Sequence, residues 1–196
     1  ALLVMFAFFM LGSKPASAFT CTFSSNGGGT ASDWNTAANW ANCNTAAPSA
    51  GDIVIIPTAT SVTMAATPTA SAVSSIEIQG TGTLTLSSGV YVAATSTVAV
   101  AGTFNVNAGS ASTTALYIAS GGTFTITTGA ASTTSMTNNG TLNIMTGVVT
   151  STGSVSSTGV VAFSSNGLWA LFGNVTSTGT FTAGTSTLRF LGADNQ

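Results

Sequence analysis

Charge is the property that this sequence has least of. Its 196 residues include no histidine, two basic residues and four acidic residues, so only 3% are charged, whereas an ordinary soluble domain is about one quarter charged. A nucleic-acid-binding face is excluded, because phosphate backbones are bound mainly through clustered Lys and Arg. A serine nucleophile is also unsupported, since the chain offers it no histidine base.

Long hydrophobic runs are missing as well. The longest, residues 1–11, is shorter than the roughly twenty residues that span a bilayer, but it suits the core of an export signal. Pro15 follows it, and Ala16 and Ala18 supply the small residues of an A-x-A cleavage site. We expect residues 1–18 to be a signal peptide without its basic end, and the mature chain to be secreted, to start at Phe19 and to have no membrane span. A buried apolar segment, such as a pilin-like assembly helix, is the alternative.

Cysteine occurs only twice, at Cys21 and Cys43, shortly after the expected cleavage site. Because oxidising compartments let disulfides persist, we predict one bridge between them. A closed loop of about twenty residues contributes about 3 kcal/mol in the chain-entropy model. Zinc binding is the rival interpretation, but two thiols without histidine or a nearby acid cannot complete a tetrahedral shell. We therefore expect neither a metal nor a cofactor.

A repeat of about twenty residues occupies the rest of the chain. The motif Gly-Thr-Φ-x-Φ, in which Φ is apolar, recurs with a degenerate copy at Gly159, and its glycines stand at positions 82, 102, 122, 140, 159 and 179. A second glycine series follows it at positions 89, 109, 129, 147 and 167. Apolar residues alternate with Thr, Ser and Asn between these corners, which is the signature of short strands. Each period therefore contains at least two strands separated by turns.

This period predicts an all-β fold, a single-stranded parallel β-helix with about seven coils of about 20 residues each. It is too short for a helical pair, the leucine-rich frame is absent, and the crossover preference makes the coil right-handed. Stacked coils would align two interior columns of side chains, Leu84, Phe104, Phe124, Leu142, Val161 and Phe181 in one, and Leu86, Val106, Ile126, Ile144 and Phe163 in the other. We assign residues 19–57 to an N-terminal cap and residues 58–196 to repeats that continue beyond this sequence.

Side chains between the interior columns must point outward, because successive residues of a strand face opposite sides. The outward pairs are Thr83/Thr85, Thr103/Asn105, Thr123/Thr125, Thr141/Asn143, Val160/Ala162 and Thr180/Thr182. One interpretation is that an uncharged solenoid needs such polar ladders for stability and solubility. The other is ice binding, since regular Thr rows resemble the surfaces of insect-type and microbial antifreeze solenoids. Asn in two coils and Val160/Ala162 in a third interrupt the pattern.

The segment 30–57 carries a resemblance to a known class. Its order Trp34, Trp40, Pro48 and then Gly-Asp-x-Val-x-Ile-Pro at 51–57 resembles the start of bacterial secreted parallel β-helix proteins of the large adhesin and autotransporter-like kind. The resemblance implies an exported, repetitive surface or matrix protein, and it carries over no catalytic residue. Physically, Trp34 and Trp40 are suited to cover the open first coil. A carbohydrate-binding platform is the alternative role for this pair.

Enzymatic activity is not expected from these residues. Polysaccharide-cleaving β-helices need paired carboxylates or an acid cluster with Ca²⁺, and Asp33, Asp52, Glu77 and Asp194 are spread along the chain. The predicted function is a non-enzymatic, cell-surface or extracellular structural or adhesive module. Its partners would be carbohydrate or other cell-surface ligands, or further copies joined end to end. Ice binding, the stalk of a larger polysaccharide-active protein and a self-assembling filament subunit are the alternatives.

Overall fold

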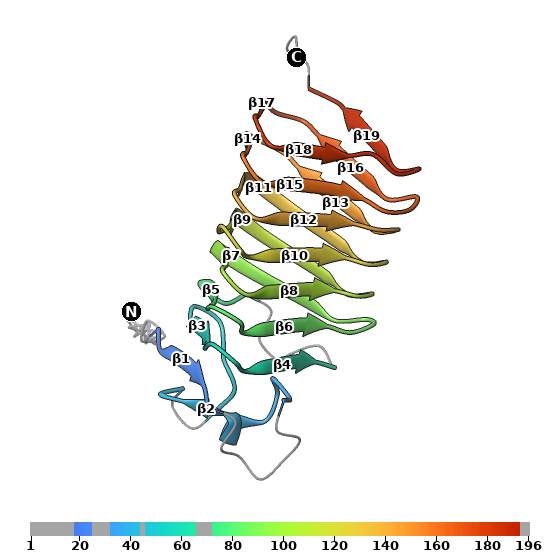
Figure 1. Cartoon of the computed structure of the whole chain (residues 1–196). Coiled ribbons are helices and arrows are strands. Elements are labelled where there is room, and N and C mark those ends of the chain that lie inside the picture. The colour runs from blue at the N-terminus through green and yellow to red at the C-terminus, as the bar shows by residue number, and fades with distance from the viewer. Residues whose placement is uncertain (1–17, 25–31, 44–45, 66–71, 193–196) are drawn as a thin grey trace, which may run out of the picture.

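The computed structural model describes residues 18–24, 32–43, 46–65 and 72–192, and it shows a parallel β-solenoid (Figure 1). The predicted signal peptide, except Ala18, and Asp194 lie outside the described residues. Seven parallel strands form one sheet, so the chain makes about seven coils, as predicted. No helix among the described residues is long and apolar enough to cross a membrane.

Two sheets form the walls of the solenoid. The seven-stranded sheet contains β4 (Ser61–Met64), β6 (Thr83–Leu86), β8 (Thr103–Val106), β10 (Thr123–Ile126), β12 (Thr141–Ile144), β15 (Val160–Phe163) and β18 (Thr180–Thr182). The twelve-stranded sheet contains β1 (Thr20–Phe23), β2 (Trp40–Ala41), β3 (Ile53–Ile56), β5 (Ser75–Ile78), β7 (Tyr91–Val100), β9 (Ser110–Ile118), β11 (Ala130–Asn138), β13 (Val148–Ser151), β14 (Val155–Ser157), β16 (Leu168–Leu171), β17 (Val175–Ser177) and β19 (Thr187–Phe190). One short 3-10 helix, η1 (Ala37–Asn39), lies in the cap.

A coil in the middle of the stack has three strand segments rather than the minimum of two. One belongs to the seven-stranded sheet, and the other two are the halves of a long strand such as β7, β9 or β11. Further along, the long strand divides into separate strands, so that β13 and β14 both pair with β11. The solenoid therefore presents three outward faces, of which two belong to the twelve-stranded sheet.

The interior columns form as the repeat predicts. Phe104 and Phe124 are Cα partners on adjacent strands, both are 1% exposed, and their rings stack with centroids 5.0 Å apart. Leu142 and Val161 continue the column in register. Phe181 also has the expected register, but it is 40% exposed. It lies in the last described coil, so one side of its ring contacts Trp169 and no described coil covers the other side.

Close contact between coils explains the glycine that opens each motif. A Cβ atom built on Gly122 would lie 2.1 Å from the carbonyl oxygen of Val100 in the preceding coil, and one on Gly159 would lie 2.1 Å from that of Gly140. Real Cβ atoms do not approach backbone oxygens so closely, so any side chain here would force the coils apart. The glycine is therefore repeated because the backbones of neighbouring coils are in close contact at this corner.

The cap covers the first edge of both sheets. Strand β1 pairs in parallel with β3, and Trp34 N donates to Thr63 O at 3.0 Å beside the edge of β4. Trp34 and Trp40 are 1% and 7% exposed and meet edge to face, with centroids 4.9 Å apart. Trp40 Nε1 donates to Trp34 O at 2.7 Å. Both indoles therefore belong to the core, and neither presents an exposed ring for a sugar to stack on.

Trp169, the tryptophan of the repeat region, is also a core residue. It is central in β16, fully buried, and its Nε1 donates to Ser151 Oγ at 3.1 Å on the neighbouring strand β13. The ring fills the interior beside Phe181, and its only polar atom is satisfied there.

Candidate functional site

The most regular surface is the outward side of the seven-stranded sheet, which we call the threonine face. Two rows run along it, Ser61, Thr83, Thr103, Thr123, Thr141, Val160 and Thr180 in the first, and Thr63, Thr85, Asn105, Thr125, Asn143, Ala162 and Thr182 in the second. Each row is a set of direct Cα partners on successive strands. The predicted outward pairs thus lie in register, in the order that the repeat gives them.

The first rung of this face was not predicted. Ser61 and Thr63 on β4 are the Cα partners of Thr83 and Thr85 on β6. They were missed because no Gly-Thr motif precedes them, and the chain reads Pro57-Thr-Ala-Thr-Ser at that place. Their distance of 22 residues from the next rung was the available signal, and it is slightly longer than the period used to align the repeats.

Neighbouring hydroxyls on the threonine face are free to bind water. Strand spacing places the rows' successive members about 4.8 Å apart, and residues i and i+2 on one strand about 6.7 Å apart. Among the described residues, the side chains of Thr83, Thr103, Thr123 and Thr141 make no hydrogen bond to the protein. In the second row, Asn143 Nδ2 donates to Thr125 Oγ1 at 3.4 Å. The face is therefore a lattice of half-buried methyl and hydroxyl groups that is open to solvent.

The two faces of the twelve-stranded sheet lack this regularity. One outward row there reads Tyr91, Ser110, Ala130, Val148, Leu168 and Thr187. Another reads Ile55, Glu77, Ala99, Tyr117, Thr137, Ser156 and Thr176. Side chains of different size and polarity follow one another in both rows. Neither of these two rows repeats one residue type as the threonine face repeats threonine.

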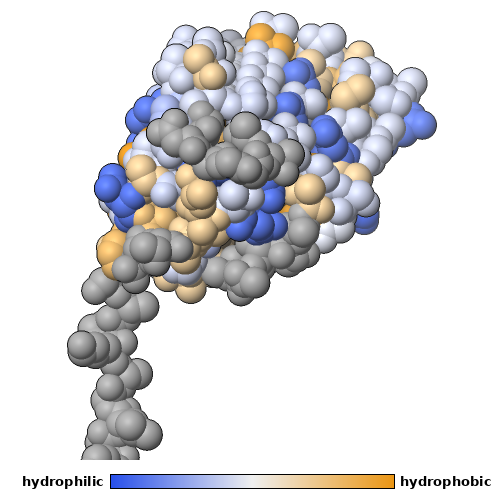
Figure 2. Space-filling view, turned by 90° about the horizontal axis from the view of Figure 1, so that it is seen from below, coloured by the Kyte–Doolittle hydropathy of each residue, from blue (hydrophilic) through white to orange (hydrophobic). Residues whose placement is uncertain are grey.

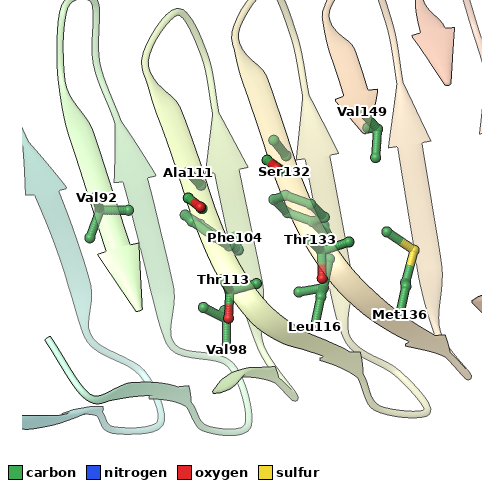
Figure 3. A pocket seen from close by; sticks show the side chains of 13 residues that line it. Val92, Val98, Phe104, Ala111, Thr113, Leu116, Ser132, Thr133, Met136 and Val149 are labelled. Atoms are coloured by element: carbon green, nitrogen blue, oxygen red, sulfur yellow. The ribbon is translucent and has the colours of Figure 1, made fainter. Parts of the chain in front are cut away.

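Hollows in the described residues are poor candidates for a ligand site. The interior space beside Phe104, Leu116 and Met136 measures about 10 Å³, and Figure 3 shows side chains from neighbouring coils closing around it. That volume holds one water molecule at most. A larger hollow of about 380 Å³ lies open at the corner of Gly89, Gly109 and Gly129, and no charged side chain lines it. Neither hollow places reactive groups opposite a substrate.

The cysteines form the predicted disulfide, with their Cα atoms 4.7 Å apart. Contrary to expectation, an acid is nearby, because a carboxylate oxygen of Asp52 and both sulfurs lie within 4.8 Å of one another. The sulfurs are bonded to each other and cannot act as thiolate ligands. Asp52 instead accepts hydrogen bonds from Phe19 N at 2.9 Å and from Ser49 N and Oγ at 2.7 and 2.9 Å.

The other described acids have separate surroundings. Asp33 accepts hydrogen bonds from Asn35 N at 3.1 Å and Thr36 Oγ1 at 3.2 Å, so it orders a turn in the cap. Glu77 lies exposed on β5, pointing outward as its alternation predicts, and accepts from Gln79 Nε2 at 2.8 Å. Within the described ranges, each carboxylate has its own hydrogen-bond donors and makes no ion pair. Arg189 lies exposed on β19, at the opposite end of the stack from the cap.

Seen from the cap end, most of the described surface is pale, with small and separate hydrophilic and hydrophobic patches (Figure 2). This agrees with a composition of Thr, Ser, Gly and Ala and with the scarcity of charge. Comparisons of the chain with protein-family models, with curated proteins and with solved structures found no match.

Proposed function

We propose that this protein is an exported, non-catalytic β-solenoid that serves as a structural or adhesive module on or outside the cell. The observation that carries the proposal is the unbroken stack of coils around an apolar core, with one long regular face and no described cavity that gathers reactive groups. The resemblance of segment 30–57 to adhesin- and autotransporter-like β-helix proteins supports the same role. The disulfide supports export, because such bonds persist in oxidising compartments.

Adhesion by such a surface would depend on many weak contacts. Rows of hydroxyl and amide groups can hydrogen-bond to carbohydrate hydroxyls at repeated intervals, and they do so without the salt dependence of charged partners. Carbohydrate or another uncharged cell-surface ligand is therefore the favoured partner. A stalk that carries a polysaccharide-active domain, or a filament subunit, would use the same stack as a spacer.

Export and adhesion can be tested with one bacterial expression experiment. With an initiator Met and a basic segment placed before Ala1 to supply the end that the signal lacks, we expect the protein to leave the cytoplasm, and N-terminal sequencing of the exported form to begin at Phe19. Immobilised exported protein should retain insoluble polysaccharides or intact cells, and retention should change little with salt, because only 3% of the residues are charged. A cytoplasmic protein that keeps residues 1–18 behind the completed signal would contradict export, and retention that salt abolishes would contradict this mode of adhesion.

A second candidate function, ice binding, is favoured by the register of the threonine face. Its methyl and hydroxyl groups repeat in two dimensions on a rigid sheet, and such a surface can order water into a matching layer. Nine of its fourteen outward positions are threonine. This regularity distinguishes it from the two faces of the twelve-stranded sheet.

Ice binding predicts that the protein inhibits ice recrystallisation, and that Thr123→Tyr removes most of this activity. A tyrosine ring at the centre of the threonine face would protrude and keep the neighbouring threonines from contacting a flat ice surface. Thr137→Tyr, on the twelve-stranded sheet and also outward, is the matched control and should leave the activity unchanged. Equal loss in both variants would show that the threonine face is not the binding surface. If the unmodified protein does not inhibit ice recrystallisation at high concentration, ice binding is contradicted.

A further inference from the structure

The Asp52 side chain connects Phe19, near the beginning of the described residues, to the first coil. This side chain is 2% exposed, and Oδ1 accepts a hydrogen bond from the backbone nitrogen of Phe19 at 2.9 Å. Oδ2 accepts from Ser49 N and Oγ at 2.7 and 2.9 Å. Ile53 N, next in sequence to Asp52, donates to Phe19 O at 2.8 Å. One buried carboxylate therefore joins Phe19, the turn at Ser49 and the beginning of β3.

This carboxylate lacks a positive partner among the described residues. All three of its hydrogen-bond donors are neutral, and the one cationic side chain in the described ranges, Arg189, is on β19 at the other end of the stack (Figure 1). Burying a carboxylate without a counter-charge is unfavourable, even where hydrogen bonds satisfy its oxygens. The site thus combines a buried anion with a backbone nitrogen that is one hydrogen bond away.

Phe19 is also the residue at which the sequence predicts cleavage. Ala18 is exposed, so the bond between Ala18 and Phe19 lies at the surface while the Phe19 nitrogen points at Asp52. Hydrolysis adds water across this bond, leaving a carboxylate on Ala18 and an amine on Phe19. An α-amine has a pKa of about 8 in model peptides and takes up a proton near neutral pH.

We propose that removal of residues 1–18 completes the Asp52 site, because the new α-ammonium of Phe19 forms a buried ion pair with the Asp52 carboxylate and locks the cap onto the first coil. The neutral N–H that now lies 2.9 Å from Oδ1 becomes a cation in the same place. Charge-assisted hydrogen bonds are about twice as strong as neutral ones. This proposal rests on the proposed function in one respect: export would supply the cleavage after Ala18. The ion pair itself does not depend on how the chain is cut.

The ion pair would act beside the disulfide. Cys21 lies two residues after Phe19, and its sulfur is 3.6 Å from Asp52 Oδ2, a contact without a hydrogen bond because a bonded sulfur carries no proton. Leader removal and cysteine oxidation, both events of export, therefore strengthen the same corner of the molecule. An unprocessed chain would have a weaker cap than the mature one.

The test compares one protein before and after a defined cut. Residues 1–18 are replaced by a leader that a specific protease removes to leave Phe19 as the first residue. Cutting is expected to raise the midpoint of thermal unfolding by about 3 °C or more. The matched control is a leader whose removal leaves Ala18 in place, so that Phe19 keeps its amide, and here no rise is expected. A rise of equal size in both would overturn the proposal.

Amine reactivity gives a second readout, because residues 19–196 contain no lysine and the cut chain has a single amine. Acylation of Phe19 should be about tenfold slower than acylation of Ala18 in the control chain, since it requires the cap to open. Asp52→Asn should remove both the slow reaction and the thermal shift, and the two leaders still decide the matter if that variant does not fold. Equal acylation rates would contradict the ion pair. Exported protein that starts elsewhere would contradict the predicted cleavage site alone.

Discussion

Replacing Phe124 by alanine is expected to lower the free energy of unfolding by about 3–5 kcal/mol. The side chain is 1% exposed in the middle of the interior column, stacked on Phe104 and followed in register by Leu142. Its removal leaves a gap lined by residues of three coils, next to the space of about 10 Å³ that Phe104 and Phe124 already border. The parallel ladders hold these coils at strand spacing, so the gap cannot close easily. Guanidinium denaturation followed by far-UV circular dichroism measures the loss.

Thr123→Ala is the matched control for this substitution. Thr123 precedes Phe124 on the same strand, points outward and makes no side-chain hydrogen bond within the described residues. Its replacement should cost no more than about 0.5 kcal/mol. Similar losses at the two positions would mean that the column does not carry the stability of the stack. A larger loss at Thr123 would place the apolar interior on the other side of the sheet.

Chain length between motifs was enough to predict the stacking partners. Equal coils bring equivalent residues together, and Phe104 and Phe124, twenty apart, are direct partners. The 18-residue step from Thr123 to Thr141 preserves the register as well, because Ile118 and Asn138 remain partners and the corner after Asn138 is two residues shorter. Variation in the period is therefore taken up in a turn, where the loss of two residues does not alter either ladder.

In the coils of β9 and β11, the third strand segment could not be predicted in the same way. In these two coils its inward positions carry small or polar residues, such as Ala111, Ala131 and Thr133, whereas Val92, Val149 and Trp169 take the equivalent position in β7, β13 and β16. Thr133 is 3% exposed, and its hydroxyl donates to Ser135 O at 2.6 Å, which makes a polar residue acceptable in the interior. A search for alternating large apolar residues finds no signal in such a segment. Backbone pairing with the coils on either side, rather than side-chain pattern, defines these strands.

Candidate sites were predictable to the extent that they repeat. The threonine face follows from the motif, since alternation assigns each Thr an outward direction and the period aligns the rows. The contact between Phe19 and Asp52 joins residues 33 positions apart in the cap, outside the repeats. No period marks such a contact, and only the fold of the cap shows that Asp52 is buried beside the expected cleavage site.

Replacing both cysteines by alanine is expected to destabilise the protein by about 3 kcal/mol. The bridge joins residues 22 positions apart, so the unfolded chain gains conformational freedom when the bridge is absent. Cys21 and Cys43 are 0% and 5% exposed, and alanine fits both positions without adding a polar group to the core. Denaturation of the oxidised protein and the variant measures the difference. Reduction of the unmodified protein should cause a similar loss and should leave the variant unchanged.

The location of this loss provides a further check on the same variant. Coils of a solenoid interact only with their neighbours, so a weakened cap should fray the first coils before the middle ones. Hydrogen exchange should therefore accelerate in β1 and β3, which pair with each other beside the bridge, and stay slow in β10 and β12. Uniform acceleration along the chain would contradict a local cap and indicate a single cooperative unit. Unchanged stability would mean that packing of Trp34 and Trp40 alone holds the cap in place.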